Sequence, residues 1–226
     1  IPAGLLELEV TESCCIDDMA QETQGLRRLR ALIDRVRPVR VSEHLAWSTW
    51  RGQYHPDLLP FPRSNEALQR ITTNILRTQD ALGRCIAIEN PSHYLHLDGH
   101  ELDEIDFLGE LVRRTDCSLL LDVNNVHVSA HNLGFSASDY LARFPAQAVS
   151  EVHLAGFSED DQGVLLIDSH DATIAEPVWT LYRQLIQRIG PRPTLIERDG
   201  NLPAFSDLLG ERDIAQGILD HAGATP

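Results

Sequence analysis

The stretch SLLLDVNN, residues 118–125, joins a short apolar run to a carboxylate at its end, and the same combination recurs along the chain. Five other apolar runs end with such groups: LLELEV with Glu7 and Glu9, VRVSEH with His44, CIAIE with Glu89, VSEVH with His153, and TLIE with Glu197. The runs are continuously apolar, which is typical of parallel strands covered on both faces. They therefore predict a parallel sheet with metal-type ligands at the carboxyl ends of its strands.

Helical patterns separate these strands and indicate a β/α architecture. Apolar residues recur at three-to-four spacing in residues 19–36, 64–83, 103–116, 177–190 and 205–222. Four residues mark helix ends: Ser64 as a cap, Gly83 as a stop, Pro177 as a start and Gly190 as a stop. We expect a (β/α)8 TIM-type barrel. Only six strands are visible in the sequence, so its first strand is expected to be absent from this chain.

The composition favours one large enzyme domain, which we place at residues 1–226. A chain of 226 residues with 42% apolar content can bury a full core. Its net charge of −15 argues against nucleic acid as a partner, because phosphate binding needs a basic surface. No apolar run reaches the roughly 18 residues of a membrane span and no signal segment opens the chain, so we expect a cytoplasmic protein without membrane contact.

The four cysteines and one proline-rich segment need separate interpretation. Cys14, Cys15, Cys85 and Cys117 show no CxxC spacing, and we expect reduced thiols in or near the core, with the first two able to face a barrel mouth. Residues 51–64 are rich in proline and aromatic side chains and predict a long loop that acts as a lid or rim. There, Trp50, Tyr54 and Phe61 would offer aromatic surface for a peptide beside His55.

Carboxylates at strand ends are the strongest ligand candidates. Glu89 directly follows a buried apolar run, where a carboxylate must be paired or bound to a metal. Asp122 follows the same logic, and Asn124 or Asn125 could add an amide oxygen or orient that carboxylate. A turn is the alternative for this segment, since Asn-Asn also suits turns. Glu197 could instead form a simple salt bridge with its neighbours in the sequence.

Histidines complete the candidate set. His153 ends a strand, whereas His44 could equally be a satisfied, half-buried residue. Asp168 and His170 are two residues apart, and an extended segment would project both to one face. His55 lies in the proline-rich segment. Five further histidines lie in polar surroundings and are expected at the surface: His93, His96, His100, His131 and His221.

The number of strong donors indicates more than one metal ion. A single ion uses four to six ligands. The sequence offers eight: His44, His55, Glu89, Asp122, His153, Asp168, His170 and Glu197. Two or three metal ions, bridged by Glu89 and Asp122, would use them all.

These segments resemble, in the same order, the multinuclear non-haem iron-dependent oxidative enzymes, which are xylose-isomerase-like barrels and relatives of the methanobactin-type peptide-modifying oxidases. The resemblance covers almost the whole chain. It rests on the strings SEHLAW, HPDLLPFP, IENPSHYL, LLLDVNNVHVSA, EVHLAGF, IDSHD, EPVWTLY and LIERDGNLP. Two departures stand out: the family's glycine-rich first strand is missing, and Leu133 replaces the histidine of an Asn-His-Gly-Phe motif, so any contact made by that histidine is absent.

The resemblance implies an oxidoreductase with two or three irons per chain and dioxygen as co-substrate. The substrate would be peptidyl cysteine in a ribosomally made precursor peptide, which a companion protein often presents. The eight donors above take the iron-ligand roles, Asn125 is added as a ninth ligand, and Asp199 is assigned a catalytic role.

Three other functions remain open from the residues alone. A divalent-metal sugar isomerase or epimerase would share the barrel but needs a lysine or paired acids near the substrate carbon, and the chain has no lysine. A zinc hydrolase acting on phosphodiesters would use similar ligands, but the acidic balance opposes its substrate. The third is a non-catalytic scaffold that binds a peptide without turnover.

Overall fold

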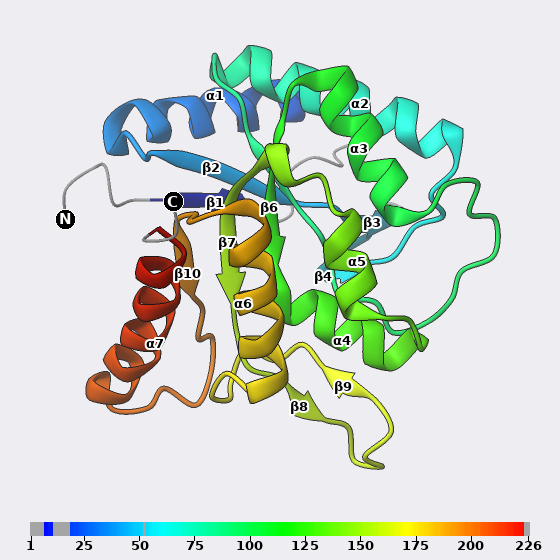
Figure 1. Cartoon of the computed structure of the whole chain (residues 1–226). Coiled ribbons are helices and arrows are strands. Elements are labelled where there is room, and N and C mark those ends of the chain that lie inside the picture. The colour runs from blue at the N-terminus through cyan, green and yellow to red at the C-terminus, as the bar shows by residue number, and fades with distance from the viewer. Residues whose placement is uncertain (1–6, 11–18, 52, 224–226) are drawn as a thin grey trace. The chain divides into compact units, whose positions relative to one another are not determined.

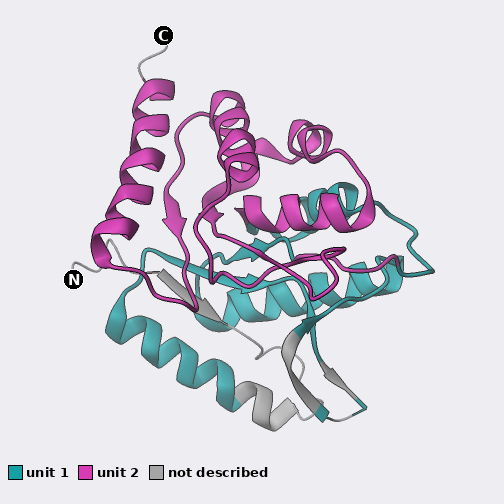
Figure 2. Ribbon diagram, turned by 90° about the horizontal axis from the view of Figure 1, so that it is seen from below, with its two compact units in different colours: residues 1–91, 97–119 teal, residues 92–96, 120–226 magenta. Residues whose placement is uncertain are grey.

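The computed structural model describes residues 7–10, 19–51 and 53–223 and divides the chain into two compact units. Unit 1 comprises residues 1–91 and 97–119, and unit 2 comprises residues 92–96 and 120–226 (Figure 2). The boundary falls inside strand β6 (Ser118–Asp122), which begins in unit 1 and ends in unit 2. The expectation of one domain over residues 1–226 stays a prediction.

Unit 1 contains the first three predicted strands, and they are parallel. β1 (Glu7–Val10) pairs with β2 (Arg40–His44), and β2 pairs with β5 (Ala87–Glu89). The three predicted helices of this unit are also confirmed, with α1 in contact with α2 and α2 with α3. They are α1 (Met19–Val36), α2 (Asn65–Leu82) and α3 (Glu104–Thr115).

The predicted ends of α2 follow from local chemistry. The Ser64 hydroxyl accepts a hydrogen bond from the Ala67 amide at 3.1 Å, which satisfies one of the amides left open by the first helical turn. Gly83 takes the left-handed conformation (φ 63°) and its amide donates to the Gln79 carbonyl. α2 therefore stops where the next strand has to begin.

The prediction of a long loop over residues 51–64 is wrong, because most of that segment is a hairpin. β3 (Trp47–Trp50) and β4 (Gln53–Leu59) pair antiparallel. Pro56 suggested a loop, but proline is tolerated in strands that leave one edge unpaired. Phe61 also differs from its predicted role as rim surface: it is 6% exposed, and its ring lies 5.9 Å from Trp47 and 5.7 Å from Phe107 between centroids.

Unit 2 repeats the β/α alternation (Figure 1). β7 (Val149–Leu154) and β10 (Thr194–Ile196) are parallel neighbours, and β8 (Ser158–Glu159) pairs antiparallel with β9 (Leu166–Ile167). Helix α6 packs against α4, α5 and α7. The helices are α4 (Val123–Leu133), α5 (Ala137–Arg143), α6 (Glu176–Ile189) and α7 (Phe205–Gly223), with a 3-10 turn at Ala146–Ala148. Pro177 lies in the first turn of α6 and Gly190 caps its end, as predicted.

Two thiols can be compared with the sequence-based expectations. Cys117 is buried, as expected, whereas Cys85 is exposed, which corrects the expectation of a thiol in or near the core; both are free thiols. Burial raises the pKa of the Cys117 thiol, which fits an inert core residue. Cys14 and Cys15 lie outside the described residues. Among the helices described, none is long and apolar enough to cross a membrane.

Candidate metal centre

His44 and Glu89 of unit 1 form a pair at the carboxyl ends of neighbouring strands. They are register partners in β2 and β5, and His44 Nε2 lies 3.2 Å from Glu89 Oε2. Glu89 is only 1% exposed, and its backbone carbonyl accepts the amide of Leu45 at 3.1 Å. Parallel pairing thus explains why an imidazole and a buried carboxylate, far apart in sequence, meet at this edge.

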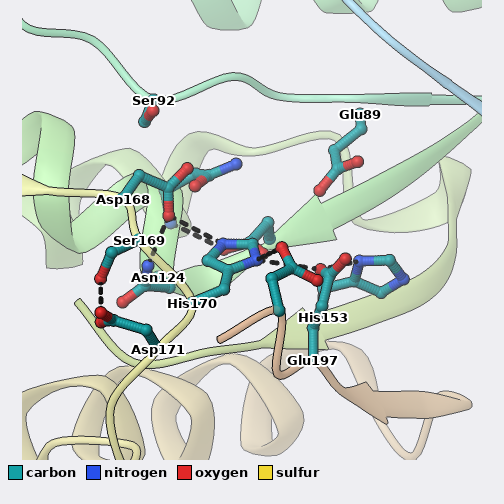
Figure 3. A network of polar contacts seen from close by, with 12 residues as sticks. Glu89, Ser92, Asn124, His153, Asp168, Ser169, His170, Asp171 and Glu197 are labelled. Atoms are coloured by element: carbon teal, nitrogen blue, oxygen red, sulfur yellow. Dashed lines mark hydrogen bonds and ion pairs between the residues drawn. The ribbon is translucent and has the colours of Figure 1, made fainter. Parts of the chain in front are cut away.

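Five predicted ligands lie together in unit 2, and four of them, His153, Asp168, His170 and Glu197, form the network of polar contacts shown in Figure 3. His170 is its centre: Nε2 lies 2.8 Å from Asp168 Oδ1, and Nδ1 lies 3.4 Å from Glu197 Oε2. The same Glu197 oxygen lies 3.3 Å from His153 Nδ1. Asp122, His170 and Glu197 each place one ligand atom within 4.8 Å of the others, a spacing that one ion could bridge. The prediction that these strand ends bring donors together is confirmed within this unit.

Asp122, Asn124 and Asn125 lie close together in the sequence but make different contacts. Asp122 caps α4, since its side chain accepts the Asn125 amide at 2.7 Å. A turn was the alternative expected for the Asn-Asn segment, and the structure has the first turn of α4 there instead. Asp122 is buried at the end of β6. Asn124 Nδ2 donates to Asp168 Oδ1 at 2.8 Å, so Asn124 orients a second carboxylate. Its own buried Oδ1 accepts no hydrogen bond from the described residues. The assignment of Asn125 as a ligand stays a prediction.

The backbone at His170 differs from the extended segment expected around Asp168. His170 has φ 49°, a left-handed conformation that is uncommon for residues other than glycine. Two hydrogen bonds hold it there: its amide donates to the Gly156 carbonyl at 3.1 Å, and its carbonyl accepts the Asp199 amide at 2.9 Å. Strain of this kind persists where the surroundings fix it, and it concentrates at functional sites. The two side chains meet because of this turn and not because of strand alternation.

Asp199 and Arg198 follow Glu197 and behave differently. The Asp199 side chain is 66% exposed, with Oδ2 3.4 Å from His170 Nδ1, so the predicted catalytic residue lies at the solvent side of the network. Arg198 pairs with Glu211 at 3.0 Å. A salt bridge between Glu197 and the next residue, Arg198, was the alternative to a ligand role, and the pairing of Arg198 with Glu211 contradicts it. Glu197 instead lies beside His153 and His170.

The ionisation of the cluster shows how closely its charges interact. Burial, followed by the nearby Asp168 charge, raises the pKa of Asp122 to about 7. Burial alone would lower the pKa of His170, but hydrogen bonds to Asp168 and Glu197 outweigh it and raise the pKa to about 12. Burial would raise the pKa of Glu197, but the two histidines bonded to it lower that pKa far below the usual range.

A divalent cation fits this donor set. Buried carboxylates repel one another and lose hydration, and a bound cation offsets both costs. Imidazole and carboxylate together suit iron, zinc and manganese better than calcium or magnesium, which prefer oxygen alone. The buried Asn124 Oδ1 adds a further acceptor near these groups. The residues present are therefore compatible with the iron implied by the family resemblance.

Other histidines fall largely where the sequence predicts. His96, His100, His131 and His221 are exposed. His93 is half-buried, which corrects the expectation of a surface position, and its amide donates to the Ser129 hydroxyl at 2.8 Å. The side chain of His55 lies outside the described part of the chain, so its ligand role stays a prediction.

Tyr94 contacts the segment of the candidate metal centre that carries Asp168, and the sequence did not predict this contact. Its hydroxyl accepts the backbone amide of Asp168 at 2.9 Å and thereby helps to fix the segment that carries Asp168 and His170. Both residues belong to unit 2. The motif IENPSHYL contained Tyr94, but no local signal connected it with a residue 74 positions away.

Gly156 gives a direct test of how the His170 turn is built. A Cβ added there would lie 2.1 Å from the Ala172 carbonyl oxygen, so the backbone would have to move. We expect Gly156→Ala to destabilise the protein by about 3 kcal/mol or more, at the high end for overpacking, and to weaken metal binding by displacing His170. Urea unfolding and a metal titration measure the two effects.

The matched control is Gly210→Ala in α7, where a Cβ meets nothing within 4 Å. Alanine at such a helical site should be neutral or stabilising by up to about 1 kcal/mol. Equal behaviour of the two variants would contradict the proposed role of Gly156.

Comparison with solved structures defines the class of fold. The chain is similar to the IOLI protein with a bound zinc atom (11% identity, TM-score 0.63), covering 95% of this chain and 77% of that one. It is also similar to a xylose isomerase domain protein from Planctomyces limnophilus (12% identity, TM-score 0.58), covering 93% and 70%. The fold is therefore that of the xylose-isomerase-like TIM barrels, with part of the barrel represented, as the sequence predicts.

Comparison with sequences identifies the family. Residues 17–220 match the family described as RiPP precursor modification enzyme MbnB/TglH/ChrH, where RiPP denotes a ribosomally made and later modified peptide. Relatives include UPF0276 proteins of Caulobacter sp. (strain K31), 60% identical over 88% of this chain and 73% of that protein, and of Paraburkholderia phytofirmans, 51% identical over 88% and 66%. The chain belongs to this enzyme family, which confirms the resemblance seen in the motifs.

Proposed function

We propose that this chain is an iron- and dioxygen-dependent oxidoreductase that modifies cysteine residues of a ribosomally made precursor peptide. One observation carries the proposal: a largely shielded network of histidines and carboxylates, centred on His170, in a chain that belongs to a family of precursor-peptide modification enzymes. The cytosol is its proposed location, and a companion protein that presents the peptide is a proposed partner.

The residues proposed to hold the irons come from the ends of several strands. In unit 2 the structure groups Asp122, His153, Asp168, His170 and Glu197. The remaining proposed ligands are His44, His55, Glu89 and Asn125. Two or three irons per chain would use this set. Bound iron would supply an electrophilic centre that takes up dioxygen and a substrate thiolate, while histidine and carboxylate ligands leave positions open for both.

The protein's own residues would control geometry and protons. Asn124 fixes the Asp168 carboxylate by a 2.8 Å hydrogen bond, and the Tyr94 hydroxyl fixes the backbone of the same residue. Asp122 and His153 are buried, so water would be excluded from their side of the metal centre. Asp199 is an exposed carboxylate beside His170, and it is proposed to accept a proton released by the substrate and pass it to solvent.

Substituting Glu89 tests how many metal ions share one carboxylate. The sequence predicts that Glu89 and Asp122 each bind two ions, so Glu89→Gln should lower the iron content by more than one equivalent per chain. Elemental mass spectrometry on protein isolated without added metal gives the count. Glu66→Gln, the same change at an exposed position of α2, is the control. Full iron content in the Glu89 variant would show that the bridging assignment is wrong.

A further inference from the structure

Arg198 and Glu211 form a buried ion pair next to the candidate metal centre. Arg198 Nη2 lies 3.0 Å from Glu211 Oε2, and the two side chains are 5% and 11% exposed. Arg198 directly follows Glu197, whereas Glu211 lies on α7. Surface ion pairs contribute little to stability, but losing one partner of a buried pair leaves a desolvated charge behind.

Glu211 also binds a second segment. Its other carboxylate oxygen, Oε1, accepts the backbone amide of Ile174 at 2.8 Å. Ile174 ends the segment that begins with Asp168 and His170, and it is buried. One carboxylate on α7 therefore bonds to two loops: residues 168–174, which supply two proposed ligands, and residues 197–201, which begin with a third.

The two loops also contact each other directly, and these contacts are more accessible. The Asp199 amide donates to the His170 carbonyl at 2.9 Å, and Asn201 Nδ2 donates to Asp171 Oδ2 at 3.2 Å. Asn201 and Asp199 are exposed, so water competes for their side-chain contacts. The charge-assisted bonds of Glu211 are shielded and should dominate the placement of the loops.

We propose that Glu211 is a positioning residue for the metal centre, which sets the spacing of His170 and Glu197 by holding both of their loops to α7. The inference rests on the proposed function only in assigning the metal ligands. Glu211 acts on the two ligands indirectly, because its carboxylate bonds to Arg198 and to the Ile174 amide. Loss of a group bonded directly to a metal ligand lowers metal affinity by about 10- to 100-fold, and we expect a loss in the lower part of this range for Glu211 because it acts through Arg198 and Ile174.

Three variants test this role. Glu211→Ala removes both bonds, and Glu211→Gln retains the shape and an acceptor for the Ile174 amide but loses the charge. Glu176→Ala is the matched control, because it breaks an exposed Arg–Glu pair of 2.7 Å on α6 with the same change of charge. Circular dichroism verifies folding, and Glu211→Gln carries the test if the alanine variant does not fold.

Two measurements decide the outcome. In the metal-free protein, hydrogen exchange followed by mass spectrometry should accelerate in both loops for Glu211→Ala, less for Glu211→Gln, and in neither for Glu176→Ala. Anaerobic titration with Fe²⁺ should show about 10-fold weaker binding for Glu211→Ala, an intermediate loss for Glu211→Gln and an unchanged value for the control.

Unchanged exchange in either loop, or Fe²⁺ affinity equal to that of the wild type in both Glu211 variants, would overturn the proposal. Peptide conversion is a separate readout. If the Glu211 variants lose Fe²⁺ affinity but the wild-type protein converts no peptide in air, the positioning role stands and the proposed activity fails.

Discussion

Asp122→Asn is expected to abolish peptide conversion and to remove iron from the cluster in unit 2. Asp122 is fully buried at the end of β6, within 4.8 Å of ligand atoms of His170 and Glu197. Asparagine keeps the size and the cap of α4 but loses the negative charge that a cation needs. Since losing only an outer partner costs about 10- to 100-fold in affinity, losing this carboxylate should cost more than about 100-fold.

The same variant should have the opposite effect on the stability of the metal-free protein. Burial and the neighbouring Asp168 make the charged form of Asp122 unfavourable, so neutral asparagine relieves that cost. Thermal unfolding should therefore show a metal-free variant at least as stable as the wild type, together with a rise in Tm on adding Fe²⁺ that only the wild type shows. Asp116→Asn, at the exposed left-handed end of α3, is the control. An equal Fe²⁺-induced rise in the Asp122 variant would contradict its role as a ligand.

Turnover is expected to depend on a cysteine within a peptide and to fail on free cysteine. Histidines and carboxylates form the candidate centre in the described residues, so no protein thiolate there competes for a position that substrate sulfur would take. Free cysteine lacks the flanking contacts whose binding energy positions the reacting carbon. Oxygen consumption measured with each compound makes the comparison, and equal rates would contradict a peptide-specific site.

The strands and the candidate ligands were readable from sequence because one pattern encodes both. A short apolar run followed by His or a carboxylate predicts a parallel strand and also the edge at which its last side chain lies, as for Glu89 and Asp122. All six predicted strands are present, as β1, β2, β5, β6, β7 and β10. The five predicted helices are present as well.

Helix α4 was missed for a physical reason. Its first turn contains Asn124 and Asn125, which are poor helix formers. Most of its residues are buried, so it lacks the polar face that gives a helical period. Tertiary packing outweighs its local preferences. The His170 turn was equally hidden, because its left-handed backbone depends on Gly156 and Asp199, which lie in other segments of the chain.

The most direct test of the proposed function is the mass of a cysteine-bearing precursor peptide after incubation with the iron-loaded protein in air and under nitrogen. We predict a mass change in air that is lost under nitrogen, and no change for the same peptide with Cys replaced by Ser. Equal conversion without dioxygen, or conversion of the serine peptide, would contradict an oxidative reaction at cysteine and return the sugar isomerase and zinc hydrolase alternatives to consideration.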